Sequence, residues 1–267
     1  MRGKYWIRVN LGSVNGVGFP ANHQLVMDSL PQELIDKIID DIPHPSLPSC
    51  SLVARRWRRG SQRRDFASVT FSSEHDLVLW CTSIPQDQGD IPSYVRTAEF
   101  KSIISWRKPA LFGRVLKELT SLRALRISDT MVPRPDQLPS SATFGEFGKA
   151  LKLLIVMEPR CTATTITSFV LSFPNLEDLF LVGEVSEGPV AVLPHTPQRE
   201  PLVSLWLDDV ENGAGISLAQ CGLTSRQLSL TVYDAGLEAL LTLSSEVIVE
   251  LSLTGAWFLE IPRQERC

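Results

Sequence analysis

Residues 176–181 read LEDLFL, with leucines at the first, fourth and sixth positions. This L-x-x-L-x-L spacing recurs along the chain, and it predicts short strands at Leu122/Leu125/Ile127, Leu151/Leu154/Val156, Leu176/Leu179/Leu181 and Leu202/Leu205/Leu207, with weaker copies at Val95/Ala98/Phe100, Ser225/Leu228/Leu230 and Ile248/Leu251/Leu253. The first positions of the seven copies differ by 27, 29, 25, 26, 23 and 23 residues. A spacing this regular indicates a structural repeat with one strand in each unit. Phe66, Val69 and Phe71 suggest one further strand before the first copy.

Apolar residues between these segments follow the period of an amphipathic helix. The i, i+3, i+4, i+7 pattern fits Leu77/Trp80/Cys81/Ile84, Phe112/Val115/Leu116/Leu119 and Ile166/Phe169/Val170/Phe173, and Leu237/Leu240/Leu241 give a shorter version. Strands that alternate with helices at this period predict an α/β solenoid, with a parallel sheet inside and helices outside.

The repeat resembles a leucine-rich repeat, whose units have a similar length. Regular repeats of that family carry Asn or Cys three residues after the last template position. Here those places hold Thr130, Pro159, Glu184, Val210, Tyr233 and Ala256. We therefore expect a degenerate, irregular solenoid over residues 72–267, with insertions at 132–141 and 183–201. The end, FLEIPRQERC, has no obvious polar cap and is typical of a truncated solenoid.

Two residues of each unit are expected to point away from the core, because side chains alternate along a strand. One lies between the last two template positions, and the other follows the last of them. In most units these positions are polar, but three central units carry Ile155 and Met157, Phe180 and Val182, and Trp206 with Asp208. Neighbouring strands lie about 4.8 Å apart, so these side chains predict one apolar patch that binds another protein. Two alternatives stay open: the insertion at 183–201 folds over the patch, or the register is shifted by one residue.

The segment MDSLPQELIDKIIDDIPHP, at residues 27–45, predicts an amphipathic helix. Ser29 and Gln32 have the spacing of a capping box, and Pro31 falls in the first turn, where its missing N–H is tolerated. Leu30, Leu34, Ile38 and Ile42 repeat every four residues, with Ile35 and Ile39 beside them. A second short helix is expected at 46–48, followed by an arginine-bearing one. Helices this short cannot bury so wide an apolar surface among themselves.

LPQELIDKIIDDI, followed by LPSCSLVARRW and DFASVTF, resembles the F-box motif in the form found in large fungal families. The resemblance covers residues 28–71, after an expected flexible extension at 1–27. It implies that the helices bind a Skp-type adaptor, which recruits a cullin–RING ubiquitin ligase. The residues that match the adaptor-facing positions of the family are Leu30, Pro31, Leu34, Ile38, Leu52, Val53 and Trp57. The alternative is that Leu34, Ile38 and Trp57 are simply a helical core.

The stretch SLVARRWRRGSQRR, at residues 51–64, holds six arginines. Phosphate binding needs such a run of cations, but Arg56, Arg59 and Arg63 also fit the solvated face of a helix whose apolar side docks. The chain as a whole has a formal net charge of -4, whereas nucleic-acid-binding domains are usually basic. We therefore favour a docking helix over a nucleic-acid interface.

The sequence shows no catalytic or metal-binding motif. The four histidines are isolated, and the five cysteines are never in C-x-x-C spacing, which fits a reducing compartment rather than a disulfide framework or zinc site. No apolar run approaches the length of a membrane span. We expect no enzyme activity, cofactor, metal, nucleic-acid partner or membrane contact, and a cytoplasmic or nuclear location.

These observations predict the substrate-recognition subunit of a Skp–cullin–F-box (SCF) ubiquitin ligase. The F-box would bind the adaptor, and the repeats would hold a target protein whose identity the sequence does not give. The alternative is a non-catalytic repeat scaffold that binds another protein without ligase assembly.

Overall fold

The computed structural model describes residues 30–53, 55–83, 91–101, 109–128, 145–159, 161–183, 185, 200–208, 214–231 and 237–254. The chain divides into two compact units, Met1–Gln62 and Arg63–Cys267, called the helical unit and the sheet unit below. The predicted extension at 1–27, the insertion at 132–141, most of the insertion at 183–201 and the last thirteen residues lie outside the described residues.

The helical unit contains the short helices that the sequence predicts. They are α2 (Gln32–Asp41), the 3-10 turn η1 (His44–Ser46), α3 (Leu47–Cys50) and α4 (Arg55–Asp65), whose last residues fall in the sheet unit. Helix α2 starts directly after Pro31, which is extended at φ -55° and ψ 145°. It ends before Ile42, which is also extended, as expected for a residue that precedes a proline. Ser29 of the predicted capping box lies outside the described residues, and the Gln32 amide donates to Asp36 Oδ1 at 2.9 Å.

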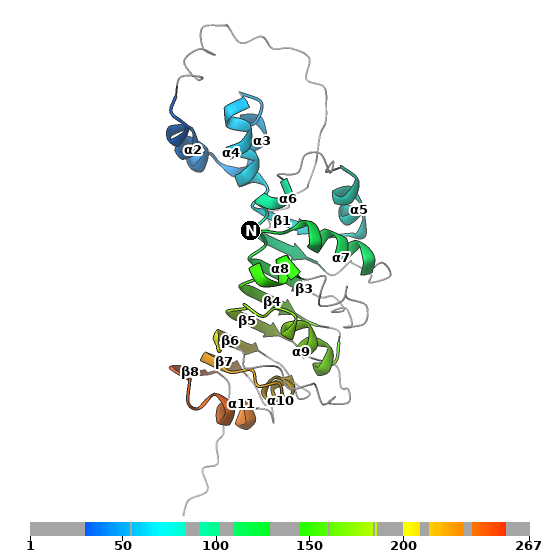
Figure 1. The fold of residues 1–267 in the computed structure, drawn as a ribbon, viewed down its shortest axis with the longest axis vertical. Coiled ribbons are helices and arrows are strands. Elements are labelled where there is room, and N and C mark those ends of the chain that lie inside the picture. Colours follow the sequence, from blue (N-terminus) through cyan, green and yellow to red (C-terminus); the bar gives the residue numbers. More distant parts are fainter. Residues whose placement is uncertain are drawn as a thin grey trace, which may run out of the picture. The chain divides into compact units, whose positions relative to one another are not determined.

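The sheet unit is built on one eight-stranded sheet in which all neighbouring pairs are parallel and the strands follow the order of the chain (Figure 1). The strands are β1 (Ser68–Phe71), β2 (Thr97–Phe100), β3 (Ala124–Ser128), β4 (Leu153–Met157), β5 (Asp178–Val182), β6 (Leu202–Asp208), β7 (Ser225–Thr231) and β8 (Glu250–Leu253). Sequential parallel strands require a crossover between each pair, which is the connectivity of a solenoid.

The template positions of the sequence stand opposite one another across the sheet. One row comprises Val69, Ala98, Leu125, Leu154, Leu179, Leu205, Leu228 and Leu251, and the next comprises Phe71, Phe100, Ile127, Val156, Leu181, Leu207, Leu230 and Leu253. From β1 to β7 these side chains are buried. The predicted strand register is therefore confirmed, and Val69 and Phe71 lie on the first strand, β1, which begins two residues after Phe66.

The helices of the sheet unit lie on one side of the sheet (Figure 1). They are α5 (Glu74–Ser83), α6 (Ile91–Tyr94), α7 (Pro109–Glu118), α8 (Gly145–Ala150), α9 (Ala163–Leu171), α10 (Ala214–Gln220) and α11 (Leu237–Ser244). Buried apolar residues of α5, α6, α7, α9, α10 and α11 belong to the same core as the template residues. Near β1 the core is aromatic: Phe71 stacks on Phe100 at 4.9 Å between ring centroids, and Phe100 meets Phe112 of α7 edge-on at 4.7 Å.

The last strand departs from the predicted core. Leu251 and Leu253 of β8 occupy template positions, yet each is 44% exposed, whereas Leu228 and Leu230 on the neighbouring strand are buried. Strand β8 is the edge of the sheet, and no described helix follows it. The spacing predicted the strand and its register correctly but not the burial of these two leucines.

Candidate binding surfaces

The side of the sheet opposite the helices carries the residues that alternate with the buried template positions; we call it the open face. Its middle row is Thr70, Glu99, Arg126, Ile155, Phe180, Trp206, Ser229 and Ser252. The row at the start of the strands is Ser68, Thr97, Ala124, Leu153, Asp178, Ser204, Gln227 and Glu250. Toward the end of the strands, Ser128, Met157, Val182, Asp208 and Thr231 are in register. This grid follows from period-two alternation.

Ile155, Met157, Phe180, Val182 and Trp206 lie together on the open face, and we call them the central patch. Phe180 stands opposite both Ile155 and Trp206, and Val182 stands opposite Met157. Four of the five side chains are half-buried, and Trp206 is 40% exposed. The rings of Phe180 and Trp206 lie 6.0 Å apart at an interplanar angle of 23°. Because the template leucines are the buried ones, the alternative of a register shifted by one residue is wrong.

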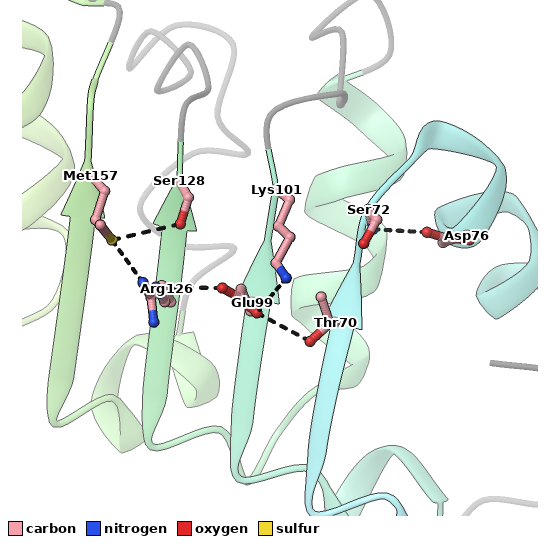
Figure 2. A network of polar contacts seen from close by, with 8 residues as sticks. All are labelled: Thr70, Ser72, Asp76, Glu99, Lys101, Arg126, Ser128 and Met157. Carbon is pink, nitrogen blue, oxygen red and sulfur yellow. Dashed lines mark hydrogen bonds and ion pairs between the residues drawn. The ribbon is translucent and has the colours of Figure 1, made fainter. Parts of the chain in front are cut away.

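Polar side chains border the central patch on the β1 side (Figure 2). The Glu99 carboxylate accepts a hydrogen bond from Thr70 Oγ1 at 3.3 Å and pairs with Arg126 Nε at 3.4 Å and with Lys101 Nζ at 3.5 Å. Arg126 Nη2 also lies 2.9 Å from Met157 Sδ, so the same guanidinium reaches the patch. Both cations of this border are therefore already paired with one carboxylate.

Acidic side chains flank the aromatic pair. Asp178 lies two residues before Phe180 on β5, and Asp208 lies two residues after Trp206 on β6. Both are half-buried on the open face, and neither carboxylate makes an ion pair or side-chain hydrogen bond with a described residue. Leu153 and Asp178 were not among the predicted site residues. The alternation that selected Ile155 and Phe180 would have found them two residues earlier on the same strands.

The helical unit has its own apolar surface. Leu34 and Ile38 of α2 are 49% and 40% exposed, and Leu52 and Val53 after α3 are 72% and 45% exposed. Leu30 is half-buried against the core of the unit, and Pro31 is exposed. Leu34 and Ile38 are four residues apart and so share one face of α2. Large apolar side chains exposed in clusters mark interaction surfaces more often than single exposed ones do.

Trp57 is not on that surface. It is 5% exposed and packs with Ile35, Ile39 and Leu47 in the core of the helical unit. The predicted adaptor-facing position is corrected accordingly: the indole belongs to the core because α4 offers no other large apolar side chain to pack on α2. The same packing answers the alternative for Leu34 and Ile38, which lie outside this core.

Helix α4 approaches α2 closely at Gly60. A Cβ atom at this position would lie 2.7 Å from Ile39 Cδ1 and 3.3 Å from Asp36 Oδ1. Around the rest of its circumference α4 is basic, with Arg55, Arg58, Arg59 and Arg63 exposed. Arg59 and Arg63 thus lie on a polar helix face, as expected, while Arg56 is half-buried.

The described residues contain no group of three or more His, Cys, Asp or Glu side chains that could bind a metal ion. Within the same residues, no helix combines the length and apolar character that a membrane crossing requires.

Comparison with known families identifies an F-box domain at residues 27–67. That range contains α2, η1, α3 and α4, together with all seven residues that the sequence resemblance pointed to. No match to a curated protein was found for the chain.

Proposed function

From the F-box domain at residues 27–67 we propose that this chain is a substrate-recognition subunit of an SCF-type ubiquitin ligase. The helical unit binds a Skp-type adaptor, which connects the chain to a cullin–RING ligase. The sheet unit, as a degenerate leucine-rich-repeat solenoid, binds the target protein on its open face.

The observation that carries the proposal is the division of apolar residues in the helical unit. Ile35, Ile39, Leu47 and Trp57 fill its core, while Leu34, Ile38, Leu52 and Val53 are exposed. Core packing therefore accounts for the first set and not for the second. The exposed set lies within the F-box match, where this family binds its adaptor.

Target binding is supported by the central patch. Its residues come from three consecutive strands in register, and the Phe180–Trp206 pair offers aromatic surface of the kind that dominates protein interfaces. The proposed mechanism is positioning: holding a target beside the ubiquitin-carrying enzyme raises its effective concentration there. It requires no catalytic residue in this chain.

The adaptor interaction is tested by co-purification of the full chain with a Skp-type protein. Leu34→Lys should abolish binding, because it puts a charge into the exposed apolar set. The matched control is Asp40→Lys, which places a lysine on the same helix about 120° away from Leu34. Asp40 is exposed, and the control alters the charge more than Leu34→Lys does. If Leu34→Lys and the control retain the adaptor equally, the chain is a repeat scaffold outside a ligase and the proposal is wrong.

A further inference from the structure

The open face is chemically asymmetric from β1 to β8. Lys101, directly after β2, and Arg126, on β3, are both paired with Glu99. On β5 to β8 the three rows of the open face contain Asp178, Asp208 and Glu250 but neither lysine nor arginine. The one cation within the described strands β5–β8 is Arg226, which is exposed at the start of β7, before these rows. This half of the face therefore has an excess of negative charge.

The aromatic pair lies at the boundary between the apolar and acidic parts. Phe180 covers one side of Trp206, at 6.0 Å between ring centroids. On the other side the next residue of the row is Ser229, followed by Ser252, and both side chains are small. Within the described residues, no large side chain of this row covers the side of the indole that points away from Phe180. The face of a tryptophan ring attracts cations, and Arg and Lys side chains are the usual protein partners.

We infer that the target segment bound on the open face is basic and apolar, with an Arg or Lys side chain against Trp206, close to Asp208, and apolar side chains on Ile155, Met157 and Val182. This inference rests on the proposed function and specifies its partner. Asp178 and Asp208 have no ion-pair partner among the described residues. They lie at opposite ends of the strands, so a cation against Trp206 can meet Asp208, and a second cation of the segment can meet Asp178, without displacing another group. An acidic segment would be repelled by those carboxylates. To pair with Arg126, its own carboxylates would have to displace Glu99.

The experiment is a selection of random dodecapeptides displayed on phage against the immobilised full chain. The pool is expected to combine Arg or Lys with large apolar residues. Synthetic peptides from the pool are then measured by fluorescence polarisation against Asp178→Asn/Asp208→Asn. We expect this variant to weaken binding about fivefold or more, because it removes two carboxylates that attract the cations of the segment while it keeps the indole of Trp206.

The matched control is Glu200→Gln/Glu246→Gln, which removes the same charge from two exposed positions outside the three rows, one before β6 and one after α11. If both double variants lose the same affinity for the peptides, the net charge of the chain explains the effect and the inference is overturned. So would a pool without enrichment of cations, or one rich in acidic residues.

Phe180→Ser/Trp206→Ser separates the inference from the function on which it rests. If this variant loses the pool but the pool is not basic, the open face remains the binding site and the inference alone fails. If it binds the pool as well as the unmodified chain does, the site is elsewhere, and both target binding on this face and the inference fail.

Discussion

The indole of Trp206 and the phenyl ring of Phe180 lie 6.0 Å apart at 23°, on adjacent strands and directly in register. Both residues stand between buried leucines of their own strands: Leu179 and Leu181 flank Phe180, and Leu205 and Leu207 flank Trp206. The leucines therefore form part of the core, while the two rings lie on the opposite face of the sheet. This separation allows stability and binding to be tested independently.

Trp206→Ser should lower the free energy of unfolding by about 1 kcal/mol, since the ring is already partly solvated and loses mainly its contact with Phe180. Leu207→Ala, one residue along the strand, removes a buried side chain and should cost about 2–5 kcal/mol. Urea unfolding of the two variants gives the comparison. A larger loss for Trp206→Ser than for Leu207→Ala would mean that the indole is core and that the central patch is not a binding surface.

The Phe180–Trp206 contact can be isolated by a double-mutant cycle. Phe180→Ser, Trp206→Ser and the double variant should be non-additive by about 0.5–1.5 kcal/mol, as for other aromatic pairs. Strict additivity would show that the rings do not stabilise each other in solution.

Trp57→Ala should destabilise the helical unit by about 3–5 kcal/mol, because it empties a buried site between α2, α3 and α4. Trp57→Phe should cost much less: the buried indole Nε1 has no hydrogen-bond partner among the described residues, so no such bond is lost with it. Hydrogen exchange of peptides from residues 30–62 measures both. Leu34→Lys serves as the comparison, since it should remove the adaptor without changing exchange. If hydrogen exchange is unchanged in Trp57→Ala, the tryptophan is a surface residue and not part of the core.

The sheet was predictable because its information is local and repeated. Most units bring Leu or a similar residue at the same template positions, so Leu179 or Leu205 can be assigned to the core without knowing what packs on it. The outward orientation of Phe180 and Trp206 followed from the same alternation. Burial at the edge was not predictable: Leu251 has the same local pattern as Leu228, and its exposure depends on what lies beyond β8.

The burial of individual residues was harder to predict in the helical unit. The apolar face of α2 is wide enough to pack on the core and to remain partly exposed for a partner. Leu34 and Ile38 lie next to Ile35 and Ile39 around the helix, and the sequence gives no reason to bury one pair rather than the other. The choice is made by α4, where Gly60 lets the helix approach Ile39 and Trp57 fills the space beside it. Trp57 was assigned to the adaptor-facing set because it matches the family motif, and the motif alone does not show that this side chain packs into the core of the helical unit.

Cys221 lies at the turn between α10 and β7. The burial of its thiol can be tested by measuring the rate of alkylation as a function of pH. Burial raises the pKa of its thiol, because the charged thiolate loses hydration. At any pH between about 7 and 9 the folded chain should hold less thiolate there than the unfolded chain, and so react more slowly with iodoacetamide. The rate in the folded chain should continue to rise at a pH where the rate in urea has levelled off. A profile in the folded chain that levels off at lower pH than in urea would contradict the burial.

Gly60→Ala tests the close approach of α4 to α2. Alanine is favoured over glycine in a helix by about 1 kcal/mol, so an open site would be stabilised by that amount. At Gly60 the new Cβ would lie 2.7 Å from Ile39 Cδ1, and Ile39 is itself buried, so its methyl group has little room to move. Overpacking of this kind costs about 1–3 kcal/mol, and we expect a net loss of stability.

Ile39→Val removes the Cδ1 atom and should by itself cost about 0.5–1.5 kcal/mol. The double variant Gly60→Ala/Ile39→Val should then be more stable than the sum of the two single changes predicts, because the methyl group that clashes is gone. Hydrogen exchange across α2 and α4 in all four proteins measures the coupling. A stabilising Gly60→Ala, or strict additivity with Ile39→Val, would show that the two helices do not pack this closely.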